Sequence, residues 1–156
     1  KYMGDCIMAF WNAPIDAPNH KEMAIDSALE MIDKLKELND SNAFGDGNKL
    51  NIGIGINSGE AVVGNMGSEQ RFDYSVLGDA VNLASRLEGI SKNYDATLVV
   101  GEDTYQNISN KYNFQKLDDV QVKGKSNKVS IYTVRESNDS ITKKETTKKI
   151  EQANTI

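Results

Sequence analysis

Asn82 and Arg86 are the two side chains whose types and spacing first indicate chemistry. A separation of four residues places them one turn apart on the same face of a helix. An amide can hold a sugar oxygen, and a guanidinium can neutralise a phosphate oxygen. The pair therefore offers contacts to a sugar and to a phosphate. From the spacing alone, a solvated asparagine and arginine on an amphipathic helix is the simpler interpretation.

The residues around this pair predict a short strand, a glycine turn and the first turns of a helix. Apolar residues alternate over residues 72–76, as they do in a half-buried strand. Gly78 then breaks the pattern, and Asp79 can cap the helix that follows. The apolar stripe of that helix recurs at helical spacing and consists of Ala80, Leu83, Ala84 and Leu87. The pair is thus expected near a strand-to-helix junction.

A second stretch of interest is the start of the chain, where Asp5 follows Gly4 in a predicted turn. From the sequence alone, Asp5 reads as a plain turn residue. The apolar run at residues 6–11 is short enough for a buried strand. Cys6 lies in this run, and we expect it to be a core residue.

Another strand is predicted at residues 50–56, where leucine and isoleucine alternate with small or polar residues. Gly53 and Gly55 lie on its other face, which indicates that another part of the chain approaches the backbone closely. A turn at residues 58–59 is expected to bring residues 60–64 back as a second strand. These two strands would form a hairpin.

The remaining pattern predicts further hairpins and helices without regular strand–helix alternation. A helix is expected to begin with a capping box of Asn19 and Glu22 and to end near Asn39. A last hairpin is expected from residues 114–122 and 128–134. This order favours an α+β fold, with helices on one face of a mostly antiparallel sheet.

The composition bounds the class of protein. A chain of 156 residues, 38% of them hydrophobic, suits one domain with a core. Its net charge of −5 argues against broad nucleic-acid binding. There is no apolar run of membrane-spanning length and no signal-peptide pattern, and a single cysteine suits a reducing compartment. We therefore expect a cytoplasmic domain, with a membrane anchor elsewhere in the protein left open. Residues 137–156 are polar and predict a disordered tail.

Four motifs, in order along the chain, resemble those of the class III nucleotide cyclases, the catalytic domains of adenylate and guanylate cyclases. The family signature resembles residues 77–87, which read Leu-Gly-Asp-Ala-Val-Asn-Leu-Ala-Ser-Arg-Leu. Its central hairpin is similar to residues 57–64, Asn-Ser-Gly-Glu-Ala-Val-Val-Gly. Its metal-binding turn is similar to residues 1–5, Lys-Tyr-Met-Gly-Asp, and its C-terminal phosphate-contacting turn to residues 122–125, Val-Lys-Gly-Lys. Four ordered motifs are strong evidence of homology, where one alone would be weak.

The resemblance implies a ferredoxin-like cyclase homology domain over residues 1–136, without its first strand, its first helices and most of its second strand. The chain starts at Lys1, inside a motif, so we expect a fragment of a longer protein. The implied activity is that of an adenylate cyclase, a lyase that converts ATP to 3′,5′-cyclic AMP and pyrophosphate in intracellular signal transduction. The ribose 3′ oxygen attacks the α-phosphorus in line, so catalysis is mostly positioning and charge stabilisation.

The resemblance also implies a role for individual residues. Lys1 matches the position that selects adenine, since a lysine can donate to N1 of adenine but not to the protonated N1 of guanine. Ser75 matches the second base-selecting position, and its hydroxyl discriminates weakly because it both donates and accepts. Asn82 matches the residue that orients the ribose, and Arg86 the one that stabilises charge on the α-phosphate. Lys123 matches a triphosphate contact. Without the family, Lys1 and Lys123 would read as solvated lysines.

Asp5 matches one of the family's two metal-binding aspartates, which implies a two-metal site for Mg²⁺ or Mn²⁺. The other aspartate belongs to the family's first strand, upstream of Lys1, so the fragment alone is not expected to hold a complete metal site. In the family one domain supplies the aspartates and the other supplies the base, ribose and phosphate contacts. A chain with both kinds of residue implies a homodimer with shared active sites and ATP as substrate.

Two alternatives stay open. A guanylate cyclase is the alternative within the class, and Lys1 argues against it. A cyclase-like module that only dimerises or binds nucleotide is a different class of function. The matched site residues argue against that module in the complete protein, and the missing first strand argues for an inert fragment. A plain structural α+β domain would make the four ordered motifs a coincidence.

Overall fold

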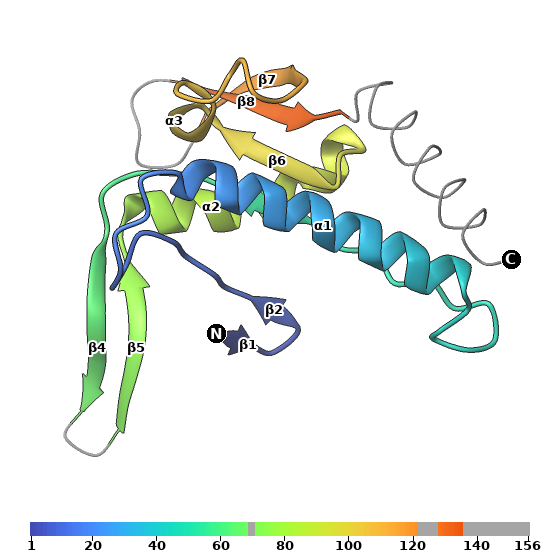
Figure 1. Cartoon of the computed structure of the whole chain (residues 1–156), viewed down its shortest axis with the longest axis horizontal. Coiled ribbons are helices and arrows are strands. Elements are labelled where there is room, and N and C mark those ends of the chain that lie inside the picture. The colour runs from blue at the N-terminus through green and yellow to red at the C-terminus, as the bar shows by residue number, and fades with distance from the viewer. Residues whose placement is uncertain (69–70, 122–127, 136–156) are drawn as a thin grey trace, which may run out of the picture.

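The computed structural model describes residues 1–68, 71–121 and 128–135 (Figure 1). Its helices are α1 His20–Asp40, α2 Asp79–Ile90 and the short α3 Glu102–Tyr105, with a 3₁₀ turn at Ser91–Tyr94 after α2. Its strands are β1 Tyr2–Met3, β2 Cys6–Ile7, β3 Ile54–Ile56, β4 Val62–Ser68, β5 Arg71–Leu77, β6 Leu98–Gly101, β7 Phe114–Gln121 and β8 Lys128–Val134. None of the helices within these ranges is long and apolar enough to cross a membrane.

The largest sheet in the described ranges has four strands in the order β3-β6-β8-β7. β3 and β6 are parallel, whereas β6–β8 and β7–β8 are antiparallel. The β7–β8 ladder confirms the predicted last hairpin, and its register shifts by one residue between Lys116 and Asp118. The predicted α+β class with a mostly antiparallel sheet is therefore confirmed.

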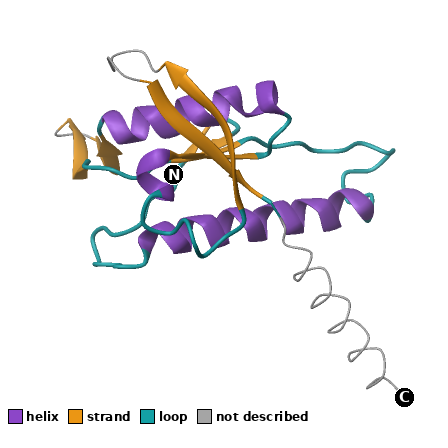
Figure 2. Ribbon diagram, turned by 90° about the horizontal axis from the view of Figure 1, so that it is seen from above, coloured by secondary structure: helices purple, strands orange, loops and turns teal. Residues whose placement is uncertain are grey.

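The two long helices cover opposite faces of this sheet (Figure 2). Leu83 of α2 packs on the face that carries Val99, and Ile25 of α1 packs on the face that carries Leu98 and Val100. The prediction that the helices share one face is wrong. The sequence of β6 fits cover on both faces. All of its residues are buried, and a strand covered on both faces is apolar throughout.

The glycines of the β3 region allow α2 to lie close against the sheet. Ile54 and Ile56 point toward the α1 side, which leaves Gly53 and Gly55 facing α2. A Cβ atom on Gly55 would overlap the backbone of Ala84 and Glu88 in α2. The expected close approach is therefore confirmed, and the approaching element is the helix that carries the candidate site.

The hairpin in the middle of the chain differs from the prediction. β4 pairs antiparallel with β5, from Val62 opposite Leu77 to Ser68 opposite Arg71, and the two form an arm that extends from the helices (Figure 1). β3 pairs with β6 instead of returning into residues 60–64. The arm is open to solvent, with Val62 70% and Leu77 61% exposed. β4 overlaps the strand predicted at residues 60–64 but continues to Ser68, because a solvent-exposed ribbon needs no apolar alternation to mark its length.

The N-terminal hairpin also departs from expectation. β1 and β2 are paired with each other, Tyr2 opposite Ile7 and Met3 opposite Cys6, and all four residues are exposed. Within the described ranges this pair belongs to a sheet of two strands. The prediction that Cys6 is a core residue is therefore wrong, because no other layer among the described residues covers its strand.

Neither predicted helix cap forms in the described part of the chain. Asn19 occupies the N-cap position of α1, but its side chain makes no capping hydrogen bond. Gly78 occupies the N-cap position of α2, so Asp79 is the first residue inside the helix. An acidic residue in the first turn still favours the helix through its dipole.

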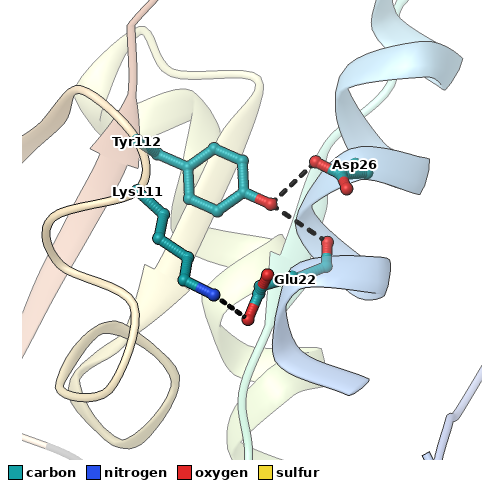
Figure 3. A network of polar contacts seen from close by, with 4 residues as sticks. All are labelled: Glu22, Asp26, Lys111 and Tyr112. Atoms are coloured by element: carbon teal, nitrogen blue, oxygen red, sulfur yellow. Dashed lines mark hydrogen bonds and ion pairs between the residues drawn. The ribbon is translucent and has the colours of Figure 1, made fainter. Parts of the chain in front are cut away.

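Glu22, the other half of the expected capping box, instead joins α1 to the segment before β7 (Figure 3). Lys111 Nζ donates to Glu22 Oε1 over 2.6 Å, and Tyr112 Oη donates to Asp26 Oδ1 over 2.7 Å. Burial, followed by the hydrogen bond to Asp26, raises the pKa of the Tyr112 hydroxyl above its usual value. This network fixes α1 against the C-terminal half of the sheet.

Candidate active site

The junction between β5 and α2 is where the candidate residues gather. The helix begins directly after Gly78, and Asn82 N donates to the Gly78 carbonyl over 3.1 Å. A Cβ atom on Gly78 would lie 3.0 Å from the Glu60 carbonyl oxygen and 3.2 Å from Ala61 Cα. The glycine thus lets the junction pass tightly against the segment that leads into β4.

Asn82 and Arg86 lie one turn apart on α2, as predicted, and both are exposed. Leu83 and Leu87, on the opposite side of the helix, are buried against the sheet. The burial of this leucine stripe fixes which face of α2 points outward. The amide and the guanidinium are therefore presented together beside the end of β5, as a site for sugar and phosphate requires.

Lys1 meets β5 through an ion pair with Asp73. Lys1 Nζ donates to Asp73 Oδ2 over 3.0 Å, and the two side chains are 35% and 53% exposed. Ser75 follows two residues later on the same strand, opposite Gly64, and is half-buried. Side chains two residues apart on a strand point to the same side. The structure thus brings Lys1 into the neighbourhood of Ser75, although no sequence motif links them.

Two further contacts hold the N-terminal segment in place. Met8 N donates to the Lys1 carbonyl over 2.9 Å, which extends the β1–β2 ladder to the Lys1 backbone. Phe10 lies against Tyr74 of β5, with ring centroids 6.1 Å apart. The backbone of Lys1 is therefore fixed by its own hairpin, and the hairpin is fixed against the strand that carries Ser75.

Asn57 is hydrogen-bonded to the first turn of α2. Its Nδ2 donates to the carbonyls of Ala80, in the first turn of α2, and of Ser58, both over 3.3 Å. Its buried Oδ1 has no hydrogen-bond partner within the described residues and faces Gly101, where a Cβ atom would overlap it. The neighbouring Ser58 Oγ is 2.8 Å from the hydroxyl of the buried Thr104. These contacts tie the helix start to the sheet.

The two remaining candidate residues are not joined to this group. Asp5 lies exposed in the turn between β1 and β2, after Gly4, whose φ of 63° suits glycine. An exposed carboxylate fits Mg²⁺, which keeps water and takes few protein ligands. Across the ranges that the structure covers, no three His, Cys, Asp or Glu side chains gather into a metal site. Lys123, with its motif at residues 122–125, lies outside the described residues.

Sequence reasoning missed Asp73 and the supporting role of Asn57. The alternation in β5 places Asp73 on the same side as Ser75, which was a usable signal. Its partner Lys1 is 72 residues away, a pairing that no local pattern reveals. Asn57 stands in a recognised motif, but only the fold shows that its amide reaches the first turn of α2.

Comparison with known proteins shows the family. The model described as the adenylate and guanylate cyclase catalytic domain matches residues 1–136. Adenylate cyclase 1 of Rhizobium meliloti is 33% identical over 134 residues, and the match covers 86% of this chain but 20% of that protein. The chain thus spans about a fifth of the length of this curated relative.

Solved structures of cyclase catalytic domains are similar to this chain. The adenylyl cyclase CyaB from P. aeruginosa has a TM-score of 0.73 at 33% identity, covering 88% of this chain and 71% of that one. The guanylate cyclase domain of RhGC from Catenaria anguillulae in complex with GTP has a TM-score of 0.65 at 34% identity, covering 80% and 64%. Cyclase catalytic domains work as dimers on a nucleotide substrate and generally use divalent metal ions. The chain belongs to the adenylate and guanylate cyclase catalytic domain family.

Proposed function

We propose that this chain is the catalytic part of an adenylate cyclase that converts ATP to 3′,5′-cyclic AMP and pyrophosphate. The observation that carries the proposal is the placement of Lys1 beside β5. Its ammonium is held by Asp73, on the side of the strand that carries Ser75. An ammonium donates to the acceptor N1 of adenine, whereas N1 of guanine is itself a donor. Relatives named adenylate cyclase support the same substrate.

The phosphate chemistry falls to α2. The ribose 3′ oxygen attacks the α-phosphorus, the bond from that phosphorus to the oxygen bridging to the β-phosphate breaks, and pyrophosphate leaves. Asn82 orients the ribose, and Arg86 stabilises the negative charge that grows on the α-phosphate oxygens. Both side chains lie on the exposed face of α2, one turn apart, where a nucleotide can reach them. We assign Lys123 to the triphosphate by its place in the family motif.

Asp5 is the residue of this chain that would bind a divalent metal ion. When bound, Mg²⁺ or Mn²⁺ lowers the pKa of the 3′ hydroxyl and neutralises the triphosphate. One exposed carboxylate is a partial ligand set, so further ligands must come from substrate oxygens, water and other parts of the protein. The proposed role of Asp5 is therefore that of one carboxylate ligand to the metal ion.

The complete site is expected between two copies of the chain. Asp5 lies at the tip of the β1–β2 hairpin, whereas the amide and guanidinium of α2 lie beside β5. In the proposed homodimer the aspartate of one copy faces the base, ribose and phosphate contacts of the other. Twofold symmetry then gives two equivalent sites.

Guanylate cyclase activity is the second candidate. It is favoured by the RhGC domain in complex with GTP, which is as similar in sequence as the adenylate cyclases. The Ser75 hydroxyl can serve either base because it donates and accepts. Lys1 argues for ATP over GTP, because N1 of guanine offers the lysine ammonium no hydrogen-bond acceptor.

A complementation assay tests the proposal. The chain is mixed with a cyclase domain that keeps its metal aspartates but has lost its own lysine, asparagine and arginine contacts. Cyclic AMP and cyclic GMP are measured by mass spectrometry after addition of ATP, GTP and Mg²⁺ or Mn²⁺. Cyclic AMP as the product supports the proposal. Absence of product from a mixture that is folded and dimeric by circular dichroism and light scattering supports the non-catalytic module.

A further inference from the structure

Asp73 forms an ion pair with Lys1, the residue assigned to adenine. None of the contacts to base, ribose, phosphate or metal ion proposed above is assigned to Asp73. Its carboxylate is 3.0 Å from the ammonium that is assigned to adenine. The contact joins the start of the chain to the middle of β5. Its position therefore decides where the Lys1 ammonium stands.

Lysine needs such a partner to select a base. Its side chain has four rotatable methylene units and a compact charge, so an unrestrained ammonium samples many positions. The hairpin fixes the Lys1 backbone through the Met8 amide, but leaves the side chain to find its own contact. An ammonium carries three donors, and the bond to Asp73 directs one of them while the other two can face a base.

The strand geometry places this restrained ammonium beside Ser75. Asp73 and Ser75 are two residues apart, about 6.6 Å along an extended strand, and point to the same side. A purine edge held by Ser75 would thus lie within reach of an ammonium attached to Asp73. Moving the ammonium away from Asp73 would weaken the distinction between adenine and guanine.

We propose that Asp73 is the positioning residue for Lys1, and that it sets the preference for ATP over GTP without touching the nucleotide. The proposal rests on the adenylate cyclase function proposed above. It concerns the restraint on the lysine rather than the lysine's own contact. A surface ion pair of this exposure contributes little to folding, so its removal is expected to affect selectivity more than stability.

The test is Asp73→Asn in the complementation mixture, with ATP and GTP in competition. The ratio of kcat/KM for ATP to that for GTP is expected to fall about tenfold, because small displacements of a positioning group have effects of this size or larger. The thermal unfolding midpoint is expected to stay unchanged. Asp95→Asn is the matched control, since it makes the same charge change at an exposed site where φ of 49° tolerates asparagine.

A double-mutant cycle separates positioning from a general charge effect. In a Lys1→Ala background, Asp73→Asn is expected to leave the ATP to GTP ratio unchanged, because the residue it positions is gone. An unchanged ratio for Asp73→Asn in the wild-type background would overturn the inference while leaving the adenylate cyclase function standing. If the wild-type mixture makes no product, the ratio of ATP to GTP dissociation constants is measured instead. An Asp73→Asn mixture with the wild-type binding ratio overturns the inference equally.

Discussion

Gly55 of β3 lies directly against the backbone of Ala84 in α2, at a separation that leaves no room for a Cβ atom. The glycine therefore sets the height of α2 above the sheet. Because Asn82 and Arg86 lie on this helix, the packing beneath it also sets the position of the candidate site. The relationship links a feature of the core to the chemistry on the surface.

Gly55→Ala is expected to destabilise the chain by about 1–3 kcal/mol, because the added methyl group must displace helix backbone. The free energy of unfolding from urea titration measures this. Gly89→Ala, on α2 itself, is the control. No other part of the described chain lies near its Cβ position, so alanine is expected to stabilise the helix by about 0.5–1 kcal/mol. Equal stability of the two variants would show that α2 does not rest on Gly55.

Arg86→Ala is expected to lower kcat of the complemented enzyme by about 10²–10³, the usual cost of losing one preorganised contact to developing charge. KM for ATP is expected to change less, because the contact strengthens in the transition state. Arg135→Ala, an exposed arginine after β8, is the control and should retain normal turnover. Near-normal turnover of the Arg86 variant would refute its assignment to the α-phosphate.

Tyr112→Phe removes the hydrogen bond to Asp26 and is expected to cost about 1 kcal/mol at neutral pH. The pKa of the Tyr112 hydroxyl is raised in the folded state, so its contribution to stability is complete below the unfolded pKa near 10. That contribution is lost as the pH rises through the higher folded pKa. The stability difference between wild type and variant should therefore shrink at alkaline pH. Tyr2→Phe, which removes a hydroxyl from the exposed β1 strand, is the matched control for this comparison.

The lowered pKa values of two neighbouring carboxylates in β7 predict how the stability of the chain changes in acid. The Tyr94 hydroxyl lowers the pKa of Asp118, and Lys116 lowers the pKa of Asp119. A depressed folded pKa stabilises the chain above the unfolded pKa near 4, and the benefit is lost as the pH falls through the folded value. Replacing both aspartates with asparagine should flatten the loss of stability below pH about 4. Asp103→Asn, an exposed change on α3, is the control for removing a surface carboxylate.

The local part of the candidate site was predictable from sequence. The alternation before Gly78 and the leucine stripe after it predict a strand that leads into a helix, and β5 and α2 confirm this. The same stripe fixes which face Asn82 and Arg86 occupy. Such features depend on residues a few positions apart, which is the range over which periodicity carries information.

What sequence could not show depends on contacts across long separations. β3 was expected to pair with the next segment, but it pairs in parallel with β6 about 40 residues later, and no local pattern specifies a partner at that separation. Lys1 and Asp73 are 72 residues apart. β4 carries too little apolar patterning to show its full length, and Cys6 reads as buried because its run is apolar, although no described residue covers it.

The most direct measurement is a competition between ATP and GTP in the complementation mixture. Both nucleotides are supplied at equal concentration, and cyclic AMP and cyclic GMP are quantified together by mass spectrometry. A base site built on Lys1, Asp73 and Ser75 predicts that cyclic AMP is the dominant product and that Lys1→Ala abolishes this preference. Cyclic GMP as the dominant product, or no product from a folded and dimeric mixture, would contradict the assignment as an adenylate cyclase.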